Sequence, residues 1–306
     1  MFKYSDSNKR YHSLDYYFKQ KYGTKVGKIC LDAGYSCKNR DGTKSNEGCY
    51  FCELTGNSDL LAPEDLLQQI AKQKTIIQRK WPQAKYQLYF QNYANTYADL
   101  ATNQKNYELY KSQEDIVALA IATRVDSIED ATLAYLDTLC GAIDVTIELG
   151  LQSCHDSTRQ LLNCQYSLAE FTACVDRIAQ TKCAIVVHII NGLPQESQEM
   201  MLATAEFINR LPINGLKIHM LYLSKGSMLE KQYRQEPFKL LSLDQYSDIV
   251  VKQLRRLRPE LVIHRLTGDG HKGQLLAPLW TLNKTAVLNM IDKKMAAGDF
   301  YQGDYA

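Results

Sequence analysis

Apolar and polar positions alternate along this chain with two different periods from about residue 60 onward. Short apolar runs of strand length are separated by longer stretches in which apolar residues recur every three or four positions, as in an amphipathic helix. Strands are predicted at 25–31, 86–90, 116–122, 144–151, 184–190, 215–223 and 261–266. Helices are predicted between them at 63–81, 128–139, 157–163, 168–181, 197–210 and 243–258. Apolar strands that are each separated by a helix favour an α/β fold with a parallel sheet, here a partial (βα)6-type barrel.

The predicted strands end in polar residues. In βα barrels the chemistry takes place at the carboxyl ends of the strands, where the following loops meet. These loops are 91–96, 123–124, 152–153, 191–196 and 224–227. We therefore expect one mouth at which their side chains converge. The barrel is expected to span residues 29–266, between an N-terminal arm of residues 1–28 and a C-terminal extension of residues 267–306.

Composition and charge limit the class of protein. The 306 residues are 45% hydrophobic and 23% charged, which is ordinary for a globular chain. The net charge of +2 is too small for a globally cationic nucleic-acid binder, although it does not exclude local basic patches. The first 20 residues lack the apolar segment of an export signal, and no run approaches 18 apolar residues. We therefore expect a cytoplasmic protein with no membrane partner.

Clustered cysteines point to a metal centre. Nine cysteines are an odd number for a disulfide framework, and a cytoplasmic location keeps thiols reduced. Cys37, Cys49 and Cys52 are spaced C-x11-C-x2-C within a loop of residues 30–52. This spacing fits zinc with one distant ligand, or a [4Fe-4S] cluster with one iron left open. Cys30 lies in a predicted strand and is left out of the ligand set. The remaining cysteines are expected to pack: Cys140, Cys154, Cys164, Cys174 and Cys183.

Several motifs follow one another along the chain. They are CKNRDG (37–42), GCYFC (48–52), QNYANTY (91–97), ATRVD (122–126), ELGLQS (148–153), HIINGLPQES (188–197), GLKIHML (215–221), KGS (225–227), RLTGDG (265–270) and LLAPLW (275–280). With these motifs, nearly the whole chain resembles the YhcC/YtqA-type family of bacterial radical SAM proteins, which is related to the catalytic subunit of the elongator complex. It departs at Cys30, where similar sequences often have Ser, and at residues 163–166, where NCQY replaces the usual Asn-Arg-Gly-His.

The resemblance implies two cofactors. Cys37, Cys49 and Cys52 would bind a [4Fe-4S] cluster whose open iron binds S-adenosylmethionine (SAM). One electron, from a donor such as flavodoxin or ferredoxin, would cleave SAM reductively to methionine and a 5′-deoxyadenosyl radical, which abstracts a substrate hydrogen. The residues implied in SAM binding are Phe51, Gln91, Asn92, Arg124, Gln152, Ser153, Asn191 and Gly192. For each polar residue, the alternative is that it caps a strand or helix.

Two residues of the predicted strand 215–223 are candidates for catalysis. Lys217 and His219 are two positions apart, so their side chains point to the same face, where His188 of the preceding strand is able to join them. Substrate binding or proton transfer is the favoured role. A metal site formed by three histidines, with His264 as the third, is the alternative, although strand histidines are more often hydrogen-bonded groups of a core or pocket.

The substrate is inferred by analogy with the elongator relative, which favours a tRNA wobble uridine whose existing side chain is remodelled. A small metabolite or protein substrate and a non-catalytic iron-sulfur or zinc module are the alternatives. Residues 1–28 hold seven Lys or Arg against two Asp, interleaved with aromatic residues, which suits phosphate contacts and base stacking. We expect this arm and helix 63–81 to form a tRNA-binding surface beside the barrel mouth. A solvated arm packed on the barrel is the alternative.

Overall fold

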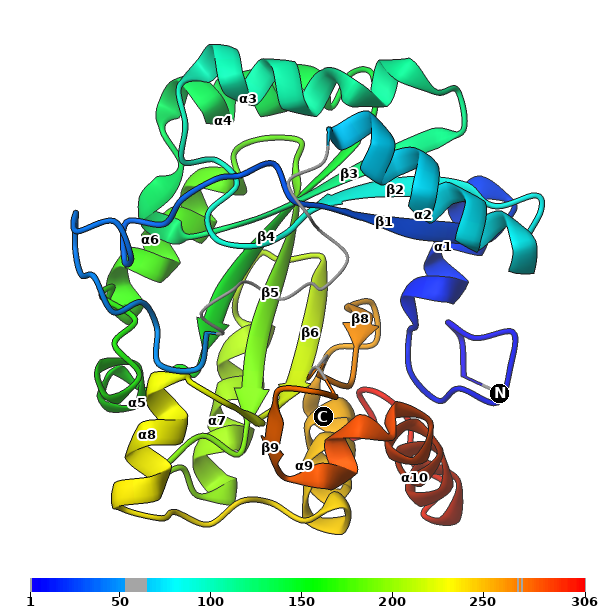
Figure 1. Cartoon of the computed structure of the whole chain (residues 1–306). Helices are drawn as coiled ribbons and strands as arrows, with labels where there is room; N and C mark the ends of the chain where they lie inside the picture. Colours follow the sequence, from blue (N-terminus) through cyan, green and yellow to red (C-terminus); the bar gives the residue numbers. More distant parts are fainter. Residues whose placement is uncertain (1, 53–64, 269, 271, 306) are drawn as a thin grey trace.

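A seven-stranded parallel sheet forms the centre of the molecule in the computed structural model, which describes residues 2–52, 65–268, 270 and 272–305 (Figure 1). Neighbouring strands pair in parallel in the order β1-β2-β3-β4-β5-β6-β8. The strands are β1 (Val26–Leu31), β2 (Lys85–Phe90), β3 (Ile116–Thr123), β4 (Asp144–Gln152), β5 (Ala184–Asn191), β6 (Gly215–Met220) and β8 (Val262–Arg265). The predicted α/β fold with a partial βα barrel is confirmed.

Helices connect these strands on the outer face of the sheet (Figure 1). They are α2 (Leu66–Lys80), α3 (Leu100–Tyr107), α4 (Asp130–Leu139), α5 (Asp156–Leu161), α6 (Leu168–Ile178), α7 (Gln198–Asn209) and α9 (Leu243–Arg256). Two of them begin with a capping box, in which Ser167 pairs with Glu170 and Ser242 with Gln245. Residues 63 and 64 of the predicted helix 63–81 lie outside the described residues.

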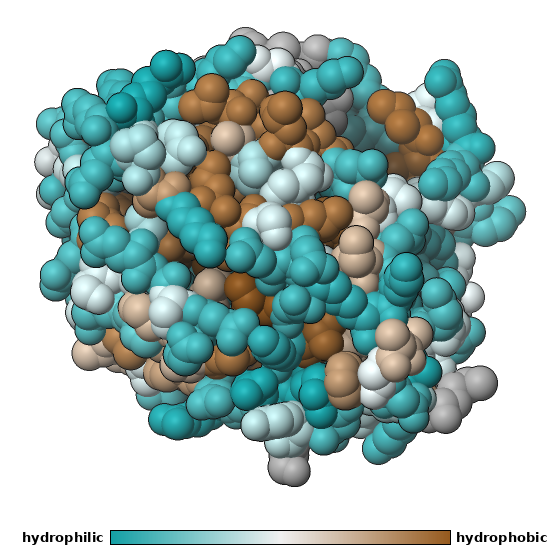
Figure 2. All heavy atoms as spheres, turned by 90° about the horizontal axis from the view of Figure 1, so that it is seen from below, coloured by the Kyte–Doolittle hydropathy of each residue, from teal (hydrophilic) through white to brown (hydrophobic). Residues whose placement is uncertain are grey.

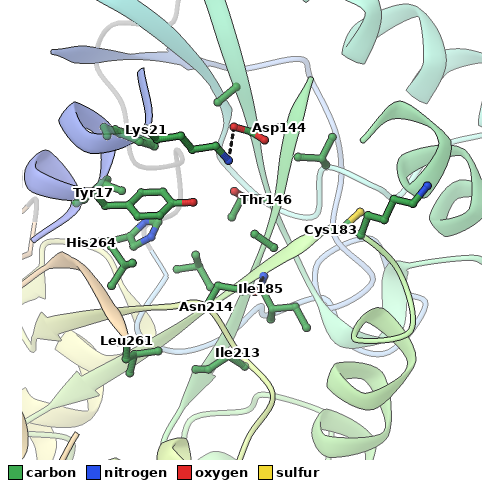
Figure 3. A pocket seen from close by; sticks show the side chains of 18 of the residues that line it. Tyr17, Lys21, Asp144, Thr146, Cys183, Ile185, Ile213, Asn214, Leu261 and His264 are labelled. Atoms are coloured by element: carbon green, nitrogen blue, oxygen red, sulfur yellow. Dashed lines mark hydrogen bonds and ion pairs between the residues drawn. The ribbon is translucent and has the colours of Figure 1, made fainter. Parts of the chain in front are cut away.

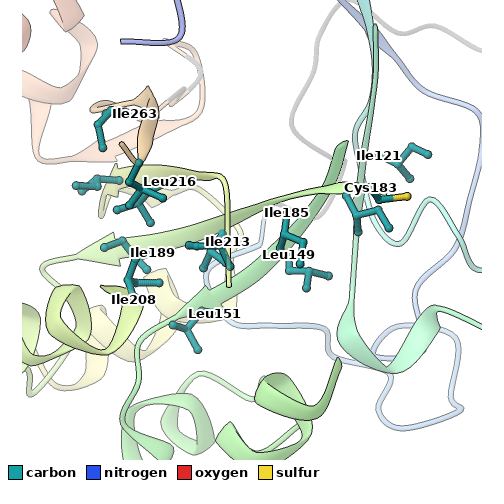
Figure 4. Close-up of a cluster of buried hydrophobic side chains, with 14 of the residues drawn as sticks. Ile121, Leu149, Leu151, Cys183, Ile185, Ile189, Ile208, Ile213, Leu216 and Ile263 are labelled. Carbon is teal, nitrogen blue, oxygen red and sulfur yellow. The ribbon is translucent and has the colours of Figure 1, made fainter. Parts of the chain in front are cut away.

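The strands divide their side chains between two different environments. On β4, Ile147, Leu149 and Leu151 are fully buried against the helices, and the close-up in Figure 4 shows Leu149 and Leu151 within this apolar core. The alternate positions, Thr146 and Glu148, line cavities inside the barrel. Because successive strand residues point to opposite faces, one apolar-looking strand supplies both the core and the polar interior.

Several elements were not predicted. They are α1 (Leu14–Tyr22), α3, α8 (Met228–Gln235), α10 (Lys284–Ala297), and a small antiparallel pair of β7 (Leu223–Ser224) with β9 (Leu275–Ala277). Strand 215–223 was predicted as one element, whereas it is divided into β6 and β7. Residues 14–22 were read as part of an arm because basic and aromatic residues alternate there, yet Ser13 caps a helix and Phe18 is buried.

The position of α1 contradicts part of the expected RNA-binding surface. Lys21 of this helix forms an ion pair with Asp144, the first residue of β4, at 2.6 Å, and Tyr22 also bonds to Asp144. The helix therefore lies at the amino ends of the strands. In Figure 1 it and the loop that carries Cys37 and Cys49 occupy opposite sides of the sheet. The expectation that the whole arm lies beside the barrel mouth is wrong.

The surface has no continuous apolar band on the face seen in Figure 2, where hydrophobic patches are interrupted by hydrophilic residues. Leu279 and Leu282, which belong to the short helical turn before α10, are among the exposed large apolar side chains. Among the described residues, no helix combines the length and the apolar character needed to cross a bilayer.

Candidate active site

A cavity of about 230 Å³ lies at the carboxyl ends of the strands, where the sequence predicted a mouth. All three cysteines of the C-x11-C-x2-C motif line it. It also receives six other predicted residues: Phe51, Gln91, Asn92, Arg124, Gln152 and His219. The structure therefore brings together nine predicted site residues that are spread over 183 positions of the sequence, from Cys37 to His219.

The loop that carries the cysteines is held in shape by its own backbone. The amide of Arg40 donates to the carbonyl of Cys37 at 2.7 Å, and that of Cys52 donates to Cys49 at 2.9 Å. Gly48 has a φ of +76°, which favours glycine, and its amide donates to Asn39 at 2.6 Å. These turns direct the C-x2-C pair and Cys37 toward one cavity.

Cys49 lies in a polar and cationic environment. Asn39 Nδ2 is 3.4 Å and Arg124 Nη1 is 3.6 Å from its Sγ. Hydrogen bonds from the thiols of Cys164 and Cys52, together with the charge of Arg124, outweigh burial and hold the pKa of Cys49 well below its ordinary value. Cys164 was expected only to pack, but it contacts this thiol. The arrangement favours the thiolate, which is the form that binds metals.

Two of the predicted SAM residues already have partners in the protein. Arg124 forms two hydrogen bonds with the carboxylate of Asp126, at 3.0 and 2.8 Å. Asn92 donates to Asp32 at 2.7 Å. Both residues line the cavity, and these bonds fix the orientation of their side chains. That Arg124 binds a carboxylate of a ligand stays a prediction.

Four other predicted residues do not line the cavity. Ser153 donates to Glu196, and the side chains of Asn191 and Gln253 exchange hydrogen bonds of 2.8 and 2.9 Å. The amide of Gly192 points to the sulfur of Met201 at 3.2 Å. Ser153 and Asn191 each directly follow an interior-facing position, so the alternation of the strand directs them away from the barrel interior. Lys217, the fourth, is 2% exposed and lies below the cavity.

A buried charged group forms the floor of the cavity. Glu148, which is 1% exposed, accepts hydrogen bonds at Oε2 from Lys217 and from His188 Nε2, the latter at 2.8 Å. The Lys217 ammonium lies 4.3 Å from the ring centroid of Tyr89. Glu148 was not predicted as a site residue, although a charged residue at an interior-facing position of an apolar strand is a signal that the sequence does contain.

The groups around Glu148 keep its carboxylate charged and keep His188 neutral. Burial alone would raise the pKa of Glu148, but Lys217, Lys28 and His188 hold it well below its usual range. Burial and the Lys217 charge lower the pKa of His188 to about 4. Glu148 Oε1 and His219 Nε2 are buried and have no hydrogen-bond partner among the described residues. Both belong to side chains that line the cavity, so they are available to a bound molecule.

The alternative of a three-histidine metal site is not supported. The rings of His188 and His219 lie 5.2 Å apart, but His264 lines a different cavity at the amino ends of the strands. Within the described part of the chain, no three His, Cys, Asp or Glu side chains are arranged around a point where a single metal ion would sit.

Comparison with known sequences identifies the family. Residues 213–297 match the family described as the Radical_SAM C-terminal domain. The protein YtqA of Bacillus subtilis is 37% identical over 306 residues, which cover 99% of this chain and 95% of the relative. The protein YhcC of Escherichia coli K12 is 33% identical over 279 residues, which cover 90% and 88%. The chain therefore belongs to the YhcC/YtqA family of the radical SAM superfamily.

Solved structures show the same fold at low sequence identity. The archaeal Elp3 of Methanocaldococcus infernus, solved with an N-terminal deletion, superposes with a TM-score of 0.65 at 13% identity. The match covers 91% of this chain but 64% of that one, so this chain spans less than two thirds of the Elp3 chain. Methylornithine synthase (PylB) gives a TM-score of 0.55 at 14% identity, over 81% of this chain and 67% of that one.

Proposed function

We propose that this chain is a radical SAM enzyme that holds a [4Fe-4S] cluster on Cys37, Cys49 and Cys52. The observation that carries the proposal is the position of the three thiols on one cavity at the carboxyl ends of the strands. A cubane cluster takes each thiolate on a different iron, so its ligands need not converge on a single point. Zinc needs such convergence, and the described residues do not provide it.

When bound, the cluster supplies the electron that cleaves SAM to methionine and a 5′-deoxyadenosyl radical, after reduction by a donor such as flavodoxin or ferredoxin. The protein orients and encloses the reactants. The amide side chains of Gln91 and Gln152 offer donors and acceptors beside the cysteines, and Phe51 offers an apolar face. Gln152 has a φ of +66°, and a Cβ on Gly150 would come within 2.5 Å of its side-chain nitrogen. This glycine is therefore required for the observed position of Gln152.

The cluster assignment is tested by anaerobic reconstitution followed by iron and SAM-product analysis. We expect about four irons per chain and release of 5′-deoxyadenosine after reduction. Alanine at Cys37, Cys49 or Cys52 should abolish both. Cys30→Ala is the matched control and should retain both, because Cys30 lies on β1 and does not line the cavity. Stoichiometric zinc without iron, or S-adenosylhomocysteine in place of 5′-deoxyadenosine, would contradict the proposal.

For the substrate, we propose a tRNA whose wobble uridine enters the cavity. Four residues near the three cysteines, Lys38, Arg40, Tyr93 and Tyr97, are here called the rim, and Arg40 and Tyr93 of them line the cavity. The rim supports this proposal, since it pairs cations with aromatic rings. The Lys38 ammonium lies 5.2 Å from the ring centroid of Tyr97, and the Arg40 guanidinium lies 5.3 Å from that of Tyr93. Such pairs suit a negatively charged backbone next to a stacked base. The wobble position is inferred by analogy with the elongator catalytic subunit, to which the family is related.

The structure of the N-terminal arm gives less support to RNA binding than the charge of its sequence suggested. Lys19 and Lys25 share the carboxylate of Asp15, and Lys21 pairs with Asp144 at 2.6 Å. These ion pairs compensate part of the positive charge that the sequence shows. Because α1 also lies at the amino ends of the strands, away from the cavity, we assign the first RNA contacts to the rim and not to the arm.

Fluorescence titration of bulk tRNA at two salt concentrations tests this assignment. We expect binding that weakens as salt rises, with a logarithmic slope of about 0.7 to 0.9 for each phosphate contact, the values typical of single strands and of a DNA duplex. Lys38→Glu at the rim should weaken binding, whereas Lys19→Glu in α1 is the matched charge reversal and should have a smaller effect. Absence of binding at low salt would favour a small metabolite or a protein as substrate. Nucleoside mass spectrometry of tRNA from cells with and without the protein then tests the uridine.

A further inference from the structure

Two cysteines that are distant in sequence meet at the amino ends of neighbouring strands. Cys140 follows α4 and Cys183 precedes β5, and their Sγ atoms are 3.5 Å apart. The pairing of β4 with β5, in which Thr146 lies opposite Ala184, brings the two segments together. The amide of Lys182 also donates to Asp137 of α4 at 2.7 Å, which holds the second segment against the helix.

Both cysteines line a cavity that the proposed radical chemistry does not use. A cavity of about 630 Å³ at the amino ends of the strands is lined by Cys140 and Cys183, and Figure 3 shows Cys183 at its edge. Cys183 is 5% exposed, whereas Cys140 is half-buried. A small polar molecule that enters the cavity therefore lies next to both cysteines.

We propose that Cys140 and Cys183 are a redox-active thiol pair that a peroxide converts into an intramolecular disulfide. The Cys183 sulfur attacks the peroxide oxygen and becomes a sulfenic acid, and the first water is released. The Cys140 sulfur then attacks the Cys183 sulfur, loses its proton and displaces hydroxide, which leaves as the second water. Two thiols and one hydrogen peroxide thus give one disulfide and two waters.

The two sulfur atoms share one hydrogen bond, in which either thiol can be the donor. In the arrangement in which the Cys140 thiol donates, this bond outweighs burial and lowers the pKa of Cys183, and it raises the pKa of Cys140. That arrangement makes Cys183 the better nucleophile toward the peroxide and leaves Cys140 to resolve the sulfenic acid.

The disulfide would join the end of α4 to the start of β5 and enclose β4, α5 and α6 in one covalent loop. Such a loop restricts the unfolded chain, so the oxidised protein should melt at a higher temperature than the reduced protein. The thiol pair lies at the opposite end of the strands from Cys37, Cys49 and Cys52. Its oxidation does not require the iron-sulfur chemistry, and the proposal stands apart from the proposed function.

The test is peptide mapping of the full-length protein after titration with hydrogen peroxide and alkylation of the remaining thiols. We expect a peptide pair linked through Cys140 and Cys183 that disappears after dithiothreitol, together with a melting temperature raised by several degrees. Cys140→Ser and Cys183→Ser should each abolish the link. Cys174→Ser, a buried cysteine on α6, is the matched control and should retain it.

Two outcomes would overturn the proposal. One is recovery of both thiols in alkylated form at a peroxide dose that has already oxidised other cysteines. The other is conversion of Cys183 to a sulfinic acid or to a disulfide with a different partner. Because the mapping is done on the unmodified sequence, a serine variant that fails to fold does not affect the result.

Discussion

The two ends of the barrel hold cavities of very different character. The cavity at the amino ends is larger, about 630 Å³ against about 230 Å³, yet cations that line it are engaged by the protein itself. Lys21 pairs with Asp144, and Arg258 donates to the backbone carbonyls of Ile208 and Asn209. Residues that line each cavity carry buried polar atoms with no hydrogen-bond partner among the described residues, Gln87 and His264 at the larger one and Glu148 and His219 at the smaller one. The smaller cavity alone combines them with the three cysteines of the C-x11-C-x2-C motif. The convergence of these thiols, and not volume, therefore distinguishes the site.

A single layer of side chains separates the two cavities. On β4, Thr146 lines the larger one and Glu148 the smaller one, and on β2 the same division falls between Gln87 and Tyr89. Lys217 fills the space between Glu148 and Tyr89. The two ends thus differ in the exposure of their ion pairs, which leads to the following predictions.

Replacing a carboxylate by its amide should have very different effects at the two ends. Glu148→Gln leaves the Lys217 ammonium buried without an opposite charge, so we expect the free energy of unfolding to fall by about 3–5 kcal/mol. Asp144→Asn is the matched change at the other end. The side chains of Asp144 and Lys21 are both 40% exposed, so the loss should stay below about 1 kcal/mol. Urea unfolding measures both values, and equal losses would contradict the comparison.

The neutral state of His188 should make stability depend on pH. Its pKa is about 4 in the folded protein against 6.5 for an ordinary histidine, so the unfolded chain binds a proton first as the pH falls. The contribution of His188 to the free energy of unfolding is fully present above pH 6.5. It is lost as the pH falls toward 4, by up to about 3 kcal/mol. His188→Gln should remove this part of the dependence. Urea unfolding of both proteins at pH 7 and pH 5 measures the difference, and parallel pH profiles would show that His188 is not the group responsible.

Two glycines with nearly the same positive φ give the smallest expected difference between the two ends. Gly48 in the cysteine loop has a φ of +76° and Gly23 at the end of α1 has a φ of +73°. Alanine at either position should cost about 1 kcal/mol of stability, because left-handed backbone disfavours a Cβ. A Cβ at Gly48 would also come within 2.8 Å of Arg40, whereas nothing lies within 4 Å at Gly23. Only Gly48→Ala should therefore lower iron content after reconstitution, and iron analysis of both variants checks this.

The sequence was sufficient for the sheet but not for all of the site. Every strand of the sheet was predicted, because buried parallel strands are apolar throughout and turns interrupt them sharply. The cysteine loop was predicted from local spacing. Ser153 and Asn191 were placed at the mouth because they end strands, but side-chain direction at a strand end depends on where the strand twists and stops. Glu148 was missed because its partner Lys217 is 69 residues away in sequence, and only the folded sheet brings the two together.

The layer formed by Glu148, Lys217 and Tyr89 also has a consequence for the order of events in catalysis. It closes the barrel interior below the smaller cavity, so the cavity is a chamber with its entrance at the mouth. Two molecules that share such a chamber must pass through the same opening. The molecule that binds at the floor has to enter before the molecule that binds at the rim. The floor molecule can leave only after the rim molecule has left. Binding of two reactants should therefore follow a compulsory order, in which the ligand at the rim blocks the opening of the cavity.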